Sequence, residues 1–153
     1  MAQNPSENPQ LPRVAAIPDA IPVENGADLH GARILVIDDE LDARRIVSIV
    51  LRASGALVFT ANCKDDALQL ADHNTFDALV SDISMPGGDG LSLLEELRKR
   101  GHQMPAIALS ALPWADVQER VQSAGFALHL VKPVELSALT AAVAGVIGSA
   151  KSS

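Results

Sequence analysis

Cysteine, histidine and long apolar runs are all scarce in this chain of 153 residues. The single cysteine, Cys63, excludes an intramolecular disulfide, and the four histidines have no zinc-ligand spacing with it. No apolar run approaches the roughly 20 residues that a membrane span needs, so we expect no membrane-embedded segment. The N-terminus also lacks the charged and apolar regions of a secretion signal, and we therefore expect a cytoplasmic protein.

Basic residues are also few. The chain has 12 Lys and Arg against 19 Asp and Glu, a formal net charge of -7 and a pI near 4.9. Nucleic-acid backbones are bound by clustered Lys and Arg, so we expect no direct nucleic-acid binding. The two denser basic groups, Arg44–Arg45 and Arg98–Arg100, fall on predicted helices and are typical of solvated helix faces or helix-end charges.

Length and composition predict one domain with its own core, because 48% of the residues are hydrophobic. Residues 1–31 hold more than half of the nine prolines and show no helical or strand periodicity. We expect them to form a disordered, Pro-rich arm or linker. Residues 32–148 are predicted to form the domain, and 149–153 a short tail.

Short apolar runs alternate with helical patterns from Ala32 onward. This alternation predicts an α/β fold with parallel strands joined by crossover helices, and nearly continuous apolar strands indicate a sheet covered on both faces. The predicted strands are 33–37, 56–60, 77–81, 105–109 and 127–131. The predicted helices are about 40–53, 64–73, 90–100, 113–123 and 134–148.

Polar residues stand at the carboxyl ends of four of these strands: Asp38 and Asp39, Asp82, Ser110, and Lys132. An open parallel sheet binds ligands at that edge, so these side chains are expected to form one site. Carboxylates about 4 Å apart repel by roughly 4 kcal/mol at an effective dielectric near 20, and a bound cation removes that repulsion. Mg²⁺ prefers such oxygen ligands and usually takes one or two carboxylates, which Asp39 and Asp82 can supply.

Beside a metal ion, the Asp82 carboxylate can attack phosphorus and form an aspartyl-phosphate. Lys132 and the Ser110 hydroxyl would then stabilise the phosphoryl oxygens, and Ser110 could carry its loop toward them. Each residue alone has a plainer interpretation as a helix cap, a turn residue or a solvated charge. Their joint placement at adjacent strand ends favours the site.

Four motifs point to a known family. They are RILVIDDE at 33–40, SDISMPGGDG at 81–90, SerAla at 110–111 and LysPro at 132–133. In order and spacing the chain resembles the response-regulator receiver domains of bacterial two-component signalling over about 32–148. The resemblance implies a flavodoxin-like, doubly wound, five-stranded parallel sheet in the order 2-1-3-4-5, with five helices.

The resemblance also implies a role for each site residue. Asp82 would be the phosphoacceptor and a metal ligand, Asp39 would bind Mg²⁺ directly, and Asp38 would act through water. The backbone carbonyl of Ser84 would be the third protein ligand. Lys132 would pair with the phosphate. In this family the lysine is often joined to a following proline by a cis peptide bond, and here that proline would be Pro133.

Ser110 would be the switch hydroxyl, with Ala111 as the small neighbour that leaves room for the phosphoryl group. His129 departs from the pattern, because many receivers have Tyr or Phe at the position of this rotating partner. His129 is therefore either a switch residue or a buried histidine with a satisfied nitrogen. Trp114, at the start of the fourth predicted helix, is either a partner contact or a residue packed on its own helix.

The implied function is signalling rather than enzymatic turnover, with at most intrinsic autophosphorylation and autodephosphorylation. A histidine kinase or a histidine phosphotransfer protein would donate the phosphoryl group. A face formed by the fourth helix, fifth strand and fifth helix would contact a downstream protein, with a phosphorylation-linked homodimer as a further possibility. The domain is either stand-alone or part of a hybrid kinase.

Two alternatives come from other classes. The chain could be a receiver-like scaffold that binds partners without phosphorylation. It could also be a phosphohydrolase of the haloacid-dehalogenase type, which uses an aspartyl nucleophile with Mg²⁺. That class needs a second Asp two residues after the first, and position 84 is serine.

Overall fold

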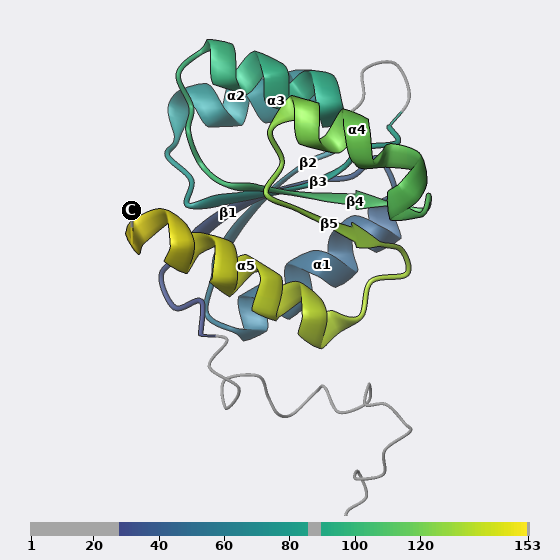
Figure 1. The fold of residues 1–153 in the computed structure, drawn as a ribbon. Helices are drawn as coiled ribbons and strands as arrows, with labels where there is room; N and C mark the ends of the chain where they lie inside the picture. The colour runs from purple at the N-terminus through teal and green to yellow at the C-terminus, as the bar shows by residue number, and fades with distance from the viewer. Residues whose placement is uncertain (1–27, 86–89, 153) are drawn as a thin grey trace, which may run out of the picture.

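The computed structural model describes residues 28–85 and 90–152, which form a parallel sheet between two layers of helices (Figure 1). The strand order is β2-β1-β3-β4-β5, and every neighbouring pair is parallel, as predicted. The strands are β1 (Arg33–Ile37), β2 (Leu57–Ala61), β3 (Ala78–Asp82), β4 (Ala106–Ser110) and β5 (Leu128–Val131). The helices are α1 (Leu41–Ala53), α2 (Lys64–His73), α3 (Gly90–Lys99), α4 (Trp114–Ala124) and α5 (Leu136–Ser152).

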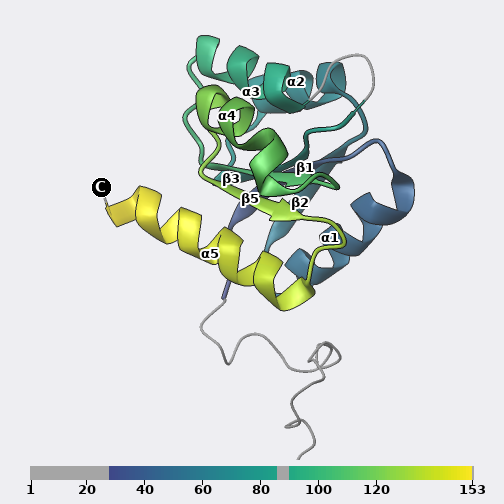
Figure 2. The same ribbon diagram turned by 45° about the vertical axis from the view of Figure 1, so that its right-hand side comes forward.

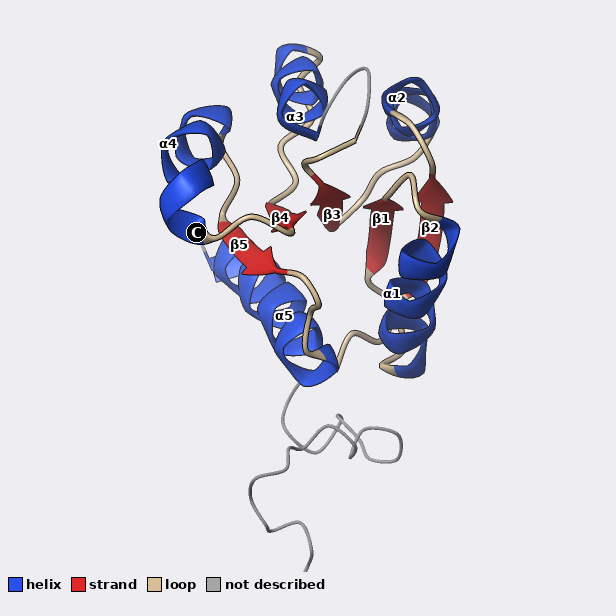
Figure 3. Cartoon of the chain, turned by 90° about the vertical axis from the view of Figure 1, so that its right-hand side faces the viewer, coloured by secondary structure: helices blue, strands red, loops and turns tan. Residues whose placement is uncertain are grey.

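The helices divide between the two faces of the sheet. Helices α1 and α5 cover one face, while α2, α3 and α4 cover the other, as Figures 2 and 3 show from two sides. Alternation along β1 sends Leu35 into the core under α2–α4 and Ile34 into the core under α1 and α5. The central strands β3 and β4 are buried at every position, whereas the edge strands β2 and β5 expose Leu57 and Leu128.

Four strands begin one residue later than predicted. Strands β2, β3 and β4 also end one residue later, so Asp82 and Ser110 are the last residues of their strands rather than the first residues beyond them. The register explains the shift at Asp82, which is still paired with Leu109 of β4. A polar residue at a strand end marks the functional edge correctly, but backbone pairing continues through it.

Folded residues extend beyond both ends of the predicted range 32–148. Leu29 is buried in the core under α1, and its N–H donates to the Ser54 carbonyl at 2.9 Å. Residues 28–31 therefore belong to the fold, while the rest of the predicted arm lies outside the described residues. At the other end α5 continues to Ser152, where a tail from 149 was expected, because no proline follows Gly148 to stop the helix.

No helix in the described ranges has the length and hydropathy of a bilayer-spanning segment.

The predicted stop after α1 is confirmed at Gly55, which has a φ of +100° and whose N–H donates to the Arg52 carbonyl at 2.9 Å. A Cβ on Gly55 would lie 2.8 Å from Cα of His30, so this glycine also lets residues 28–31 pack against the end of α1. Gly101 shares the left-handed conformation, with a φ of +91°, but has no atom within 4 Å of the added Cβ.

These two glycines give a matched pair of substitutions. Gly101→Ala should cost about 1 kcal/mol of unfolding free energy through backbone strain alone. Gly55→Ala should cost that amount plus about 1–3 kcal/mol from overpacking against His30. Urea denaturation measures both, and equal losses for the two variants would contradict the packing of residues 28–31 on α1.

Candidate functional site

The carboxyl ends of the strands bring the predicted acidic residues together. Asp38 and Asp39 follow β1, and Asp82 ends the adjacent β3. Each of the three offers a carboxylate oxygen, and these oxygens lie within 4.8 Å of one another. Hard oxygen donors at this spacing suit a divalent cation such as Mg²⁺.

The two neighbouring aspartates differ in how the fold holds them. Asp38 is buried: its Oδ1 accepts the Glu40 N–H at 2.9 Å, and its Oδ2 accepts from Lys132 Nζ at 3.0 Å. Asp39 is exposed at the rim of the cluster. Because both oxygens of Asp38 already have protein donors, Asp39 is the better placed of the two to bind an ion directly.

Asp82 is 4% exposed and has a different partner on each side. Its Oδ1 accepts the Ser84 N–H at 2.9 Å, and its Oδ2 lies 3.5 Å from Lys132 Nζ. Burial raises the pKa of Asp82, and the charges of Asp38 and Asp39 add to that rise against the opposing effects of Ser84 and Lys132. Burial is the largest of these causes, and the neighbouring carboxylates add less to the rise.

Lys132 lies between two carboxylates. Its Nζ is 3.0 Å from Asp38 Oδ2 and 3.5 Å from Asp82 Oδ2. Burial opposes the charged form, but the hydrogen bond to Asp38 and the charges of Asp38 and Asp82 outweigh it and raise the pKa of Lys132. The lysine is therefore held as a cation in the site. The Lys132–Pro133 peptide bond is cis, as the family resemblance implied.

Ser110 links two segments near the site. It is fully buried, and its Oγ accepts the Leu112 N–H at 2.8 Å, within its own loop. Its carbonyl accepts the Lys132 N–H at 2.8 Å. The serine thus joins the start of the β4–α4 loop to the end of β5, while its side chain bonds to its own loop rather than to the acidic cluster.

His129 has a hydrogen-bonding deficit at one of its two ring nitrogens. Its Nε2 is buried and has no hydrogen-bond partner among the described residues, and burial lowers the pKa of the imidazole. The ring packs against Trp114, with centroids 5.5 Å apart and planes tilted by 35°. Trp114 therefore contacts the neighbouring strand β5, which neither of its two expected interpretations described.

Sequence reasoning missed two residues that support the site. Arg44, interpreted as part of a solvated helix face, donates from Nη1 to the Asp38 carbonyl at 2.7 Å and so ties α1 to the acidic loop. Gly90 begins α3, where an added Cβ would lie 2.5 Å from the carbonyl oxygen of Asp82. The available signals were weak: an arginine one helical turn past the acidic motif, and a glycine at a helix start.

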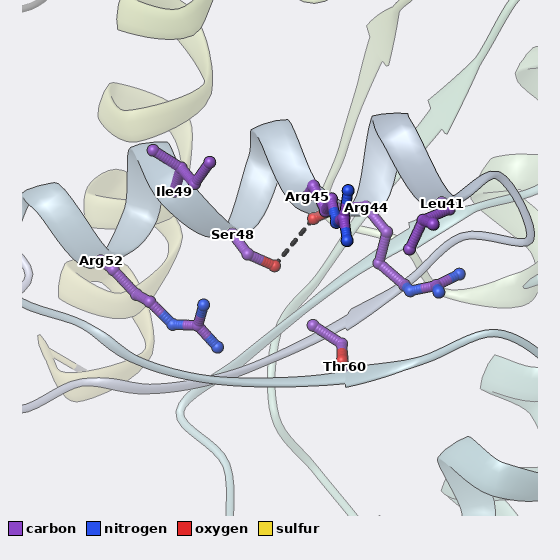
Figure 4. A pocket seen from close by; sticks show the side chains of 7 residues that line it. All are labelled: Leu41, Arg44, Arg45, Ser48, Ile49, Arg52 and Thr60. Atoms are coloured by element: carbon purple, nitrogen blue, oxygen red, sulfur yellow. Dashed lines mark hydrogen bonds between the residues drawn. The ribbon is translucent and has the colours of Figure 1, made fainter.

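Arg44 also lines a surface hollow of about 410 Å³ between α1 and the edge strand β2 (Figure 4). The side chains that line it combine apolar and cationic groups, from Leu41, Arg44, Arg45, Ser48, Ile49, Arg52 and Thr60. The acidic cluster does not line this hollow, but Arg44 connects the two through its bond to Asp38.

Comparison with known proteins places these features in a family. Residues 34–144 match the family described as the response regulator receiver domain. The sensor histidine kinase RcsC of Salmonella typhi is 36% identical over 106 residues, and the transcriptional regulatory protein PrrA of Mycobacterium tuberculosis is 40% identical over 111 residues. A solved receiver domain, that of the Francisella response regulator 1452, superposes with a TM-score of 0.72 at 30% identity.

The extent of these matches differs greatly. The match covers 69% of this chain but 11% of RcsC, and 72% of this chain but 48% of PrrA. It covers 78% of this chain and 99% of the Francisella domain. The chain thus matches one region of each of the two larger proteins and almost the whole of the isolated domain.

The lowered pKa of His129 predicts a pH effect on stability. Because the native pKa lies below the unfolded value of about 6.5, the unfolded state binds more protons, and stability is lost as pH falls below about 6.5. His129→Phe should reduce this loss. Urea denaturation of both proteins between pH 7.5 and pH 5 measures the effect, and identical pH profiles would contradict it.

Proposed function

Because the chain belongs to the response regulator receiver family of two-component signalling, we propose that it is a phosphoacceptor whose Asp82 takes a phosphoryl group from a phosphohistidine. The donor is a histidine kinase or a histidine phosphotransfer protein. The observation that carries the proposal is the position of Asp82, a buried carboxylate between two acidic neighbours and the ammonium of Lys132. That arrangement combines a nucleophile with groups that can hold a cation and a phosphate.

The transfer exchanges one bond to phosphorus for another. A carboxylate oxygen of Asp82 attacks the phosphorus, the P–N bond to the donor imidazole breaks, and the imidazole leaves with that electron pair. The Ser84 N–H holds Oδ1, so Oδ2, on the Lys132 side, is the oxygen left for the new bond. Ser84 in this role orients the nucleophile through its backbone.

The acidic cluster fits Mg²⁺, which when bound neutralises the carboxylates and the incoming phosphoryl oxygens. Asp39 and Asp82 would ligate it directly, with the Ser84 carbonyl as the third protein ligand. Asp38, whose oxygens bond to Glu40 and Lys132, would reach it through water.

Lys132 is the cation that meets the new phosphoryl group. Its Nζ is shared between Asp38 and Asp82 before transfer, and a phosphoryl oxygen on Asp82 would compete for the same ammonium. The raised pKa of Lys132 keeps it charged for that contact. Transfer therefore redistributes the hydrogen bonds of a group that is already in place.

The output is a protein contact on the face formed by α4, β5 and α5. Large apolar side chains are exposed there on the β4–α4 loop, the start of α4 and β5, namely Leu112, Trp114, Leu128 and Val131. Ser110 and His129 act as the switch between the phosphoryl group and this face. The same face is available to a downstream protein or to a second copy of the chain. The domain works in the cytoplasm and has no turnover beyond its own phosphorylation and dephosphorylation.

The two alternatives explain less. A scaffold that never accepts phosphate has no use for a lysine held between two buried carboxylates. This chain lacks the second Asp that a haloacid-dehalogenase-type phosphohydrolase needs, because position 84 is a serine, whose N–H bonds to Asp82.

Phosphorylation is testable with a small donor. Acetyl phosphate and Mg²⁺ should add one phosphate to the wild-type protein, detected by intact mass and phosphate-affinity gel. Asp82→Asn should remove nearly all of it, while Asp72→Asn, at an exposed carboxylate in the last turn of α2 that pairs with Arg100, should be labelled normally. An unlabelled wild type, or an Asp82→Asn variant labelled equally, would refute the proposal.

Metal binding has its own test. Asp39→Asn should weaken Mg²⁺ binding by about tenfold or more, because it removes one charged ligand from the cluster. Isothermal titration calorimetry gives the affinity, again with Asp72→Asn as the control. Unchanged Mg²⁺ affinity in the Asp39 variant would place the ion elsewhere.

A further inference from the structure

Trp114 covers a histidine whose hydrogen bonding is incomplete. The indole packs against the His129 ring at a centroid distance of 5.5 Å with the planes tilted by 35°, and Trp114 is 38% exposed. His129 Nε2 is buried and has no partner among the described residues. A buried ring nitrogen without a partner is costly, so His129 remains in this position only while its packing outweighs that cost.

Both members of the ring pair are connected to Ser110. On one side, the Ser110 Oγ accepts the N–H of Leu112, two residues before Trp114. On the other side, the Ser110 carbonyl accepts the N–H of Lys132, three residues after His129. A change at Ser110 therefore reaches the two rings by separate backbone routes.

The sheet places the histidine on the same face as that serine. His129 is paired with Ala108 on β4, and Ser110 stands two residues further along the same strand. The cross-strand neighbour of His129 is thus a small alanine, which offers little side chain to restrain the imidazole. Trp114 provides the large aromatic contact instead.

We propose that Trp114 transmits the state of Ser110 to the surface. The inference rests on the proposed phosphorylation of Asp82. When the Ser110 hydroxyl turns toward a phosphoryl oxygen, it releases the Leu112 N–H, the start of α4 shifts, and the Trp114–His129 contact opens. Trp114 is a positioning residue in this scheme, since it touches neither the phosphate nor Asp82, and its exposed outer side belongs to the output face.

The composition of the chain makes this measurable without a label. Trp114 is the only tryptophan and there is no tyrosine, so tryptophan fluorescence reports on this ring alone. Beryllofluoride with Mg²⁺, which mimics a phosphoryl group on an aspartate, should change the emission of the wild-type protein. The change should follow the occupancy of Asp82 and be absent in Asp82→Asn.

Ser110→Ala separates the relay from a direct electrostatic effect on the indole. The emission change per phosphate gained from acetyl phosphate, with the phosphate counted by mass, should be mostly lost in this variant. Ser123→Ala, at an exposed hydroxyl on α4, is the control and should respond like the wild type. His129→Ala should alter the emission before beryllofluoride is added, because the ring contact is already lost.

Hydrogen exchange supplies a second readout. If Trp114 had only a structural role, beryllofluoride would not change the exchange rate of the Leu112 amide. Exchange of the Leu112 amide should speed up by about tenfold when wild-type protein binds beryllofluoride. Trp114→Phe should be phosphorylated to the wild-type extent, within about twofold. If the wild type gains phosphate but its emission and its Leu112 exchange do not change, this inference is wrong and the proposed function stands. If the wild type gains no phosphate, the proposed function, on which the inference rests, is wrong.

Discussion

The repulsion among three carboxylates at one edge of the sheet is the constraint on which the site depends. Asp38, Asp39 and Asp82 meet because parallel strands all end at the same edge, and the ammonium of Lys132, which follows β5, offsets part of their charge. Removing one partner from a buried ion pair typically costs 3–5 kcal/mol, because the remaining charge is left uncompensated. The lysine therefore stabilises the acidic pocket, and the pocket in turn keeps the lysine protonated.

The supporting contacts all reach this pocket from separate parts of the chain. Arg44 holds the Asp38 carbonyl from α1, Gly90 allows α3 to start against the Asp82 carbonyl, and Ser110 joins the β4–α4 loop to β5. None of these three groups belongs to the acidic cluster. A substitution at any of them would thus alter the site through its backbone, while leaving its ionisable groups in the sequence.

Much of this was predictable from sequence, for physical reasons. Strand and helix alternation is a local pattern, and polar residues that interrupt apolar runs mark strand ends. The α/β class and the meeting of Asp38, Asp39 and Asp82 followed from these two patterns, whereas the strand order came from the family resemblance. The contacts that were missed depend on tertiary geometry. Neither the burial of Leu29 under α1 nor the stacking of Trp114 on His129 leaves a periodic signal, because each joins residues from different elements. The incomplete hydrogen bonding of His129 is likewise visible only once its surroundings are known.

The packing of residues 28–31 on Ser54 and Gly55 also decides where the preceding chain is attached. Ser54 and Gly55 lie between the end of α1 and the start of β2, at the amino edge of the parallel sheet, whereas the acidic cluster lies at its carboxyl edge. Whatever precedes residue 28 is thus tethered on the opposite side of the domain from Asp82. A molecule that contacts only the carboxyl edge would leave that anchor in place, and a pull on the chain before residue 28 would act first on the α1–β2 turn.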